Sequence, residues 1–293
     1  MILTRFDPQI HRPNPVTDDT PESHLFYVLS WGYAADHGFS WWVKALNAHP
    51  ELLVYLANEG SRPKYFPEER SRAHRPDAVK FTRFLADVGM TYTAIGDCYS
   101  YRCPMMEPVR QTFGGAVRMV QLTRNPYVFL HFHIAWRSRN MRMLPGESGP
   151  LDHEWNAVDH ERMARLGLKP YTKEDMEVWS AYQGMIRLND ILADTKTLIP
   201  HLPLEKIMQD REWFQALVGY LTHGRIHYDD ALLDRVYDWV ATPFRGEKPL
   251  PVDPERDAQD WPDWKQEAFT KLVRPETLQM FRELGYALSQ LPA

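Results

Sequence analysis

The sequence predicts an α/β protein with a mostly parallel central sheet flanked by helices and a helix-rich C-terminal half. Up to about residue 140, short runs of apolar and aromatic residues alternate with longer stretches of helical periodicity. After that point helical patterns dominate. Strands that alternate with helices usually pair in parallel through crossover helices, so this order of patterns favours a parallel sheet.

The first strand, loop and helix form the unit around which we organise the prediction. Leu25 to Leu29 is an apolar run typical of a buried strand, and a loop follows from Ser30 to His37. A helical pattern begins at Gly38 and ends at His49-Pro50, because proline cannot continue a helix. This geometry places free backbone N–H groups against a phosphate or sulfate. The alternative is an ordinary turn between a strand and a helix.

The remaining elements of the first half follow the same alternation. They are expected at 52–56 (strand), 77–88 (helix), 91–95 (strand, ending at Gly96-Asp97), 104–113 (helix), 117–122 (strand) and 126–139 (helix). Ligands of such sheets bind beyond the carboxyl ends of the strands. We therefore expect the loops that hold Glu59, Asp97 and Arg124 to lie at the ligand-binding edge.

The second half is expected to pack helices around the sheet. Its elements are a loop or lid with one short helix at 140–170, a helix at 173–193, a strand at 204–208, helices near 211–221 and 229–240, a surface excursion at 242–263 and a final helix at 275–288.

Length and composition narrow the class of protein. The chain has 293 residues, 44% of them hydrophobic, and we expect an N-terminal arm over 1–24 and a single domain over 25–293. The net charge of -5 argues against general nucleic-acid binding, and two cysteines are too few for a disulfide framework. The N-terminus lacks the apolar core of a signal peptide, and no run reaches the ~18 apolar residues of a membrane helix. These features predict a cytoplasmic protein without a membrane partner.

Two segments resemble the sulfotransferase family. GFSWWVKALNAHPEL, which begins at Gly38, resembles the family's 5′-phosphosulfate loop and helix, and VRMVQLTRNPYVFLHFHIAWRSR, which begins at Val117, resembles its 3′-phosphate segment. LVRPETLQMFRELGYAL looks like the family's closing helix. The resemblance implies a P-loop-like α/β fold that transfers a sulfuryl group from 3′-phosphoadenosine-5′-phosphosulfate (PAPS) to a hydroxyl or amine and releases adenosine 3′,5′-bisphosphate (PAP).

The resemblance also implies nucleotide-binding residues. Backbone N–H groups around Gly38, Phe39 and Ser40 would hold the 5′-phosphosulfate, and the Ser40 hydroxyl would donate a further hydrogen bond. The guanidinium of Arg124 would pair with the 3′-phosphate. An aromatic ring would stack on the adenine, and the candidates are Trp41, Trp42 and Trp136.

The loop departs from the family pattern at three positions. Asp36 stands where the family usually has Lys or Arg, and this anion would repel the phosphosulfate. His37 replaces a Ser and, if protonated, would restore the missing cation. Phe39 replaces a Thr, so one hydroxyl donor is lost.

The 3′-phosphate segment departs from the pattern as well. Phe132 stands where the family usually has a Ser, and His131 and His133 flank it, so that either histidine is a candidate to bind the phosphate. Arg118, near the start of the same segment, adds positive charge that either a phosphate site or a solvated face explains.

Two residues are candidates for the base that removes a proton from the acceptor. Glu59 lies where carbohydrate-type members of the family place a catalytic glutamate, and its alternative is a solvated loop carboxylate. His37 is the second candidate, and its alternative is a cap within the turn. No metal site is expected, because none of the histidine pairs has regular helical spacing together with a third ligand nearby.

The sequence therefore predicts a PAPS-dependent sulfotransferase that acts on a small or medium hydroxylated acceptor, of unknown oligomeric state. Its rival is a protein of the same fold that has lost sulfuryl transfer and binds another ligand or acts as a scaffold. Asp36 favours that rival. A third possibility is a different enzyme on the same scaffold, which would turn over without the nucleotide.

Overall fold

The described part of the computed structural model contains a five-stranded parallel sheet with the order β2-β3-β1-β4-β5, which confirms the predicted α/β class. Its strands are β1 (Leu25–Ser30), β2 (Leu52–Leu56), β3 (Ala94–Tyr99), β4 (Arg118–Thr123) and β5 (His201–Pro203). The structure describes residues 3–13, 20–30, 37–56, 78–88, 91–99, 103–140, 158, 160–171, 176–239 and 253–288.

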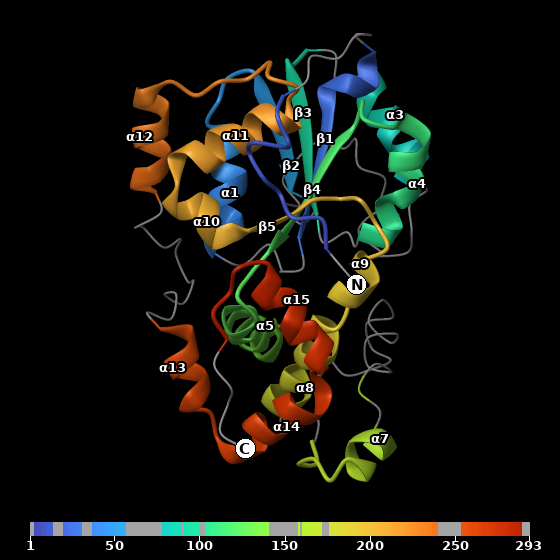
Figure 1. The fold of residues 1–293 in the computed structure, drawn as a ribbon, viewed down its shortest axis with the longest axis vertical. Coiled ribbons are helices and arrows are strands. Elements are labelled where there is room, and N and C mark those ends of the chain that lie inside the picture. The colour runs from blue at the N-terminus through green and yellow to red at the C-terminus, as the bar shows by residue number, and fades with distance from the viewer. Residues whose placement is uncertain are drawn as a thin grey trace. The chain divides into compact units, whose positions relative to one another are not determined.

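The chain divides into two compact units, and the first of them contains the sheet. This unit comprises Met1–Arg124 and Asp194–Glu247. Its helices are η1 (Pro21–His24), α1 (His37–Asn47), α3 (Ala78–Val88), α4 (Cys103–Phe113), α10 (Leu204–Gln209), α11 (Arg211–Leu221) and α12 (Asp230–Asp238). α1, α10 and α11 cover one face of the sheet, and α3 and α4 cover the other (Figure 1).

The central strand β1 is buried along its whole length because helices cover both faces of the sheet. Leu25, Tyr27 and Leu29 pack into a core cluster with Met106 and Val109 of α4. This arrangement explains why LFYVLS reads as a continuous apolar run and not as an alternating pattern.

Two predicted strands are displaced in the structure. Residues 204–208 were expected as a strand but form the helix α10, and β5 lies just before it. Leu204, Ile207 and Met208 are the buried residues of α10, and their spacing is helical. The strand expected at 91–95 begins and ends later, as β3, so Gly96 lies inside it. A Cβ atom on Gly96 would overlap the ring of Phe26 on β1, so this position requires glycine.

The second unit comprises Asn125–Ala193 and Lys248–Ala293 and is helical where it is described. Its helices are α5 (Pro126–Asn140), α7 (His160–Arg165), α8 (Met176–Leu188), α13 (Pro254–Gln259), α14 (Asp263–Leu272) and α15 (Pro275–Glu283), and α9 (Ile191–Asp194) spans the boundary between the units. α5 packs against α8 beside Gly184, where a Cβ atom would lie 2.8 Å from side-chain atoms of Leu130 and His133.

One prediction for this unit is corrected, and a second, the surface excursion, is described only over residues 253–263. The helix expected at 173–193 is interrupted after Leu188, because the Asn189 side chain donates to the Leu272 carbonyl and accepts from the Thr277 hydroxyl. The surface excursion expected at 242–263 contains α13, and Trp261 after it is buried against Tyr127 and Phe269.

The predicted division into an N-terminal arm and a single domain over 25–293 stays a prediction. Within the first unit, Leu3 and Phe6 of the arm are buried, and the Phe6 amide donates to the His201 carbonyl of β5. No helix in the described part of the chain is long and apolar enough to cross a bilayer.

Candidate functional site

The ends of β1 and β4 define the candidate site in the first unit. These strands pair in parallel with Ser30 opposite Leu122, so both chains leave the sheet at the same edge. After β4 the chain reaches Arg124, and after β1 it continues towards α1, which begins at His37.

The direction of α1 brings its N-terminus to this edge. Asn47 at its other end accepts a hydrogen bond from the Val54 amide and donates to the Val54 carbonyl, so the last turn of α1 lies beside β2. Because α1 runs antiparallel to the strands, its first turn lies at their carboxyl edge. The N–H groups of such a turn lack partners within the helix and carry the positive end of its dipole. The edge can therefore bind an anion.

Two tryptophans fix α1 in the core. Trp41 donates from its indole nitrogen to the Val236 carbonyl at 2.9 Å and packs against Phe214 and Tyr237. Trp42 also packs against Phe214. Both side chains have 0% exposure, so neither offers a ring face to a nucleotide. This burial corrects the prediction that Trp41 or Trp42 stacks on adenine. The side chain of the third candidate, Trp136, lies outside the described residues.

Arg124 is a buried cation at the end of β4. Its side chain is only 6% exposed, and its Nε atom lies 3.4 Å from Oε1 of Glu205 in the first turn of α10. Burying a charge is costly unless it is paired, so Glu205 stabilises the guanidinium and fixes its orientation. The sequence analysis missed Glu205, because a strand was expected at 204–208.

The residues after Arg124 show why the RNP segment ends the strand and begins a helix. The Asn125 side-chain oxygen accepts hydrogen bonds from the Tyr127 and Val128 amides at 2.9 and 3.4 Å, as helix-capping side chains do. Pro126 occupies the first position of α5, where its missing N–H costs nothing.

Several predicted site residues fall outside the described part of the structure. Asp36 and Glu59 are outside it entirely. For His37, Gly38, Phe39 and Ser40 only the backbone is described, and it forms the first turn of α1. The roles assigned to these residues stay predictions.

His131 and Phe132 lie next to each other on α5 in the second unit. Their rings are in edge-to-face contact at 5.3 Å, and His131 Nδ1 lies 3.9 Å from the Asp257 carboxylate of α13. His133 is fully buried, and burial followed by the charge of Arg187 lowers its pKa from 6.5 to about 3. His133 is therefore neutral at pH 7 and does not supply positive charge.

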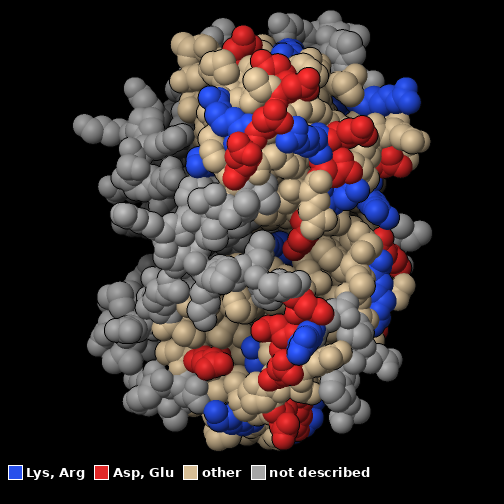
Figure 2. Space-filling view, turned by 90° about the vertical axis from the view of Figure 1, so that its left-hand side faces the viewer, with Lys and Arg blue, Asp and Glu red and all other residues tan. Residues whose placement is uncertain are grey.

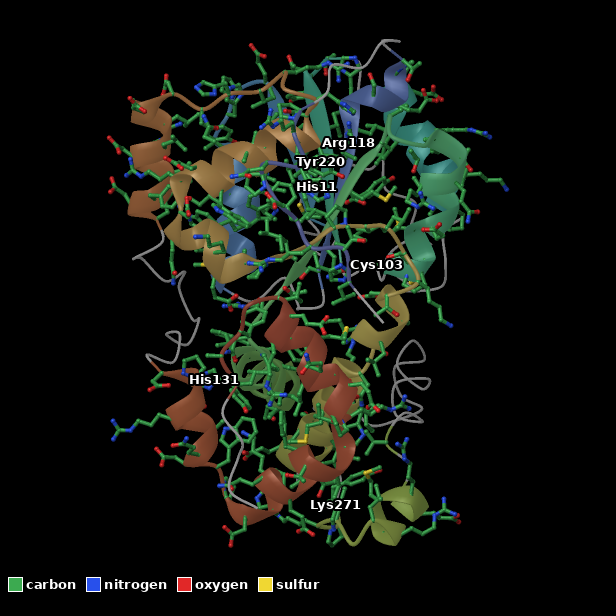
Figure 3. The ribbon with its side chains drawn as sticks, in the orientation of Figure 1. His11, Cys103, Arg118, His131, Tyr220 and Lys271 are labelled. Carbon is green, nitrogen blue, oxygen red and sulfur yellow. The ribbon has the colours of Figure 1, made fainter. Side chains whose placement is uncertain are left out.

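Asp97 was expected in a loop at the ligand-binding edge, and the charge of Arg118 was open to either a phosphate site or a solvated face; the structure places both residues within strands. Asp97 is inside β3 with 0% exposure and not in the loop beyond it, because the strand continues past Gly96. Arg118 begins β4, at the opposite end from Arg124, and its guanidinium lies 5.0 Å from the centre of the Tyr220 ring. Figure 3 shows Arg118 near Tyr220 and His11, which are themselves in edge-to-face contact. Arg118 therefore does not contribute charge at the carboxyl edge.

The described surface is mixed in charge on the face shown in Figure 2. Acidic and basic side chains are interspersed there over both the upper and the lower parts of the picture. The described charges on this face therefore do not form a broad positive field.

Comparison with known proteins gives structural matches only. No protein-family model and no curated protein matches the sequence. A sulfotransferase from Alicyclobacillus acidocaldarius is 13% identical with a TM-score of 0.44, and the match covers 90% of this chain and 96% of that one. Mouse sulfotransferase SULT7A1 complexed with PAP is 11% identical with a TM-score of 0.37, and the match covers 94% of this chain and 86% of that one. Both are sulfotransferases, the family that the sequence motifs resemble.

Proposed function

We propose that the protein is a sulfotransferase that moves a sulfuryl group from PAPS to a hydroxyl or amine of a small or medium acceptor. The observation that supports the proposal is that the first turn of α1 and Arg124 both lie at the carboxyl edge of the sheet. Ligands of open parallel sheets bind at this edge, where neighbouring strands lead to connections on opposite sides.

The anionic groups of the nucleotide have proposed partners. The N–H groups of residues 37–40 and the Ser40 hydroxyl would bind the 5′-phosphosulfate, as helix N-termini bind phosphates. Arg124, oriented by Glu205, would pair with the 3′-phosphate. His131 and Phe132 stand where the family resemblance places a further phosphate contact. Trp41 is not proposed as the residue that stacks on the adenine, because its ring is buried.

The proposed chemistry is an in-line displacement at sulfur. The acceptor oxygen or nitrogen bonds to sulfur while the bond between sulfur and the bridging oxygen breaks, and PAP leaves with the electron pair. Glu59 or His37 would take the acceptor's proton. Most of the rate enhancement would come from positioning and fixed positive groups, as in phosphoryl transfer.

Binding of PAP to Arg124 variants tests the proposal. A hydrogen bond to a charged group contributes about 1.5–3 kcal/mol, so Arg124→Ala should weaken PAP binding by about 10- to 150-fold in calorimetry. Arg124→Lys should recover part of the loss, because it restores the charge but not the planar fork. Arg118→Gln removes a cation from the other end of the same strand and is the matched control. Equal PAP affinity in wild type and Arg124→Ala would contradict the proposal.

A separate variant tests the base. Glu59→Gln keeps the size of the side chain but cannot accept the proton, so kcat should fall by about 10²- to 10⁴-fold while the Kd for PAP stays unchanged. The measurement is sulfate transfer from labelled PAPS beside calorimetric PAP binding. Unchanged kcat would remove Glu59 from the mechanism and leave His37 as the candidate.

The alternative function is a protein of this fold that no longer transfers sulfate and binds another ligand or acts as a scaffold. The observation in its favour is Asp36, an anion where the family usually has a cation. Asp36→Lys decides between the two. If the wild type binds PAP without turnover and Asp36→Lys gains both affinity and transfer, the alternative holds. If the wild type is active and Asp36→Lys lowers its activity, the altered phosphosulfate loop supports sulfate transfer and Asp36 contributes to it.

The cytoplasmic location is also part of the proposal. The chain has only two cysteines, Cys98 and Cys103, and both are buried, which suits a reducing compartment. The expected partners are PAPS and the small-molecule acceptor.

A further inference from the structure

Three side chains of the kinds that bind transition metals meet inside the first unit. Cys103, Asp194 and His201 are each no more than 1% exposed, and one potential ligand atom from each lies within 4.8 Å of the other two. Cys103 opens α4, as Figure 3 shows, and His201 opens β5. The cluster therefore joins segments that are far apart in the sequence.

The ring of His201 is oriented towards the other two residues. Its Nδ1 atom lies 3.1 Å from the Ile199 carbonyl oxygen, and in the tautomer with the hydrogen on Nδ1 it donates to that oxygen. Its Nε2 atom is thereby directed into the cluster, 3.2 Å from Asp194 Oδ2 and 4.0 Å from Cys103 Sγ. Metal-binding histidines are commonly fixed in this way, with the second ring nitrogen donating to a backbone carbonyl.

Gln121 supplies a fourth ligand atom. It lies opposite His201 in the pairing of β4 with β5. Its Nε2 atom donates to the Leu122 carbonyl at 2.8 Å, so its Oε1 atom faces Cys103 Sγ at 3.6 Å. The cluster thus offers one sulfur, one nitrogen and two oxygen atoms.

We infer that Cys103, Asp194, His201 and Gln121 form a structural zinc site. Bond lengths of Zn²⁺ to sulfur, nitrogen and oxygen place neighbouring ligand atoms of a tetrahedron roughly 3.3–3.7 Å apart. The separation of 3.6 Å lies in this range and the separation of 3.2 Å lies just below it, whereas the separation of 4.0 Å would need to close by at least about 0.3 Å. A thiolate and an imidazole select zinc over Mg²⁺ or Ca²⁺.

The surroundings favour a structural ion over a reactive thiol. Reactive cysteines are partly exposed and have a lowered pKa, whereas Cys103 is fully buried. A bound Zn²⁺ would displace the thiol proton to solvent and balance the charges of the thiolate and the Asp194 carboxylate.

This inference goes beyond the proposed function, because no residue of the cluster is assigned to the nucleotide or to the acceptor. The ion would join the first residue of α4 to β4 and β5. His201 also binds the N-terminal arm, since its amide donates to the Thr4 carbonyl at 2.7 Å and its carbonyl accepts from the Phe6 amide at 2.8 Å. With Asp194 at the end of α9, the zinc site would therefore hold five segments together.

Metal content is the first test. Protein without a histidine tag, purified without chelator, should contain about one zinc per chain by mass spectrometry of the metal. Cys103→Ala and His201→Gln should lose at least about nine-tenths of it, and Cys98→Ala, which removes the other buried cysteine, should retain it. Zinc in Cys103→Ala at the wild-type level would overturn the inference.

A second measurement does not depend on whether the variants fold. Wild-type protein grown with cobalt in place of zinc should show a thiolate-to-cobalt charge-transfer band and the strong visible bands of tetrahedral Co²⁺. Cys98→Ala should keep both features. Wild-type protein that lacks both zinc and this cobalt spectrum would show that the cluster is hydrogen-bonded without a metal, and the inference would fail.

Discussion

His133 is a buried histidine whose environment opposes its positive charge. It lies against Phe129 on α5, interacts with Gln183 of α8, and is affected by the charge of Arg187. Burial is the largest cause of the fall in its pKa from 6.5 to about 3. At a pH where the unfolded chain binds a proton at this histidine, the folded chain keeps the ring neutral, so protonation favours the unfolded state.

This difference predicts an acid-sensitive fold. Between pH 6.5 and about 3 the unfolded chain binds a proton at His133 that the folded chain does not, so stability should fall as the pH falls through this window. From pH 7 to pH 4.5, urea unfolding followed by tryptophan fluorescence should show His133→Gln losing about 2–3 kcal/mol less than wild type. His227→Gln, which alters an exposed histidine, should keep the wild-type pH dependence. Equal losses in wild type and His133→Gln would contradict this account.

Sequence reasoning succeeded for some residues and failed for others for identifiable reasons. Arg124 was expected at the end of a strand, because its neighbours Asn125 and Pro126 are a local signal for a helix start. The burial of Trp41 could not be predicted from the local sequence, because residues about 195 positions away enclose its ring. For the same reason the sequence did not predict the cluster of Cys103, Asp194 and His201, which only the folded sheet brings together.

At the level of elements, β1 and β3 approach closely because one position lacks a side chain. Gly96→Ala would place a methyl group against the Phe26 ring and should cost about 1–3 kcal/mol of unfolding free energy. Phe26→Leu should relieve part of this cost, so the double variant should be more stable than the sum of the single changes predicts. Denaturant unfolding of the four proteins measures this coupling.

Gly115→Ala is the matched control for Gly96→Ala. Its Cβ atom would lie 4.0 Å from the nearest atom, on Arg118, so its effect should stay within about 0.5 kcal/mol. If the effects of Gly96→Ala and Phe26→Leu on the unfolding free energy were strictly additive, the two positions would not be energetically coupled, which would contradict this account.

Local patterns located most elements but not their exact extents. The first helix was predicted well because His49-Pro50 is a strong stop signal. The segment 201–208 was misread because three strand residues lead directly into a helix, and apolar residues run through both. β3 was placed too early because glycine normally indicates a strand end, whereas Gly96 makes room for a neighbouring ring.

For the whole molecule, the α/β class followed from the alternation of strands and helices, whereas the order of the strands did not. Strand order depends on which crossover helix covers which face, and periodicity carries no information on that choice. The candidate site was predicted as an edge of the sheet, because the edge follows from the class alone.

The proposed nucleotide site makes a prediction about local stability. PAP should slow hydrogen exchange in peptides that cover the start of α1 and the end of β4, because ligand binding suppresses local opening. Peptides from α14 should be unaffected and serve as the internal reference. Mass spectrometry of exchange with and without PAP measures this. Slowing that persists in Arg124→Ala, or that is confined to α14, would contradict the proposed site.

The central place of β1 has a consequence during protein synthesis. β1 is complete at Ser30, but its neighbours β3 and β4 end only at Tyr99 and Thr123. A ribosome must therefore add more than 90 further residues before β1 can pair with both β3 and β4. The N-terminal arm can bind His201 only after still more of the chain has been made. In this interval the growing chain presents an unpaired apolar strand, which is a natural binding sequence for a chaperone.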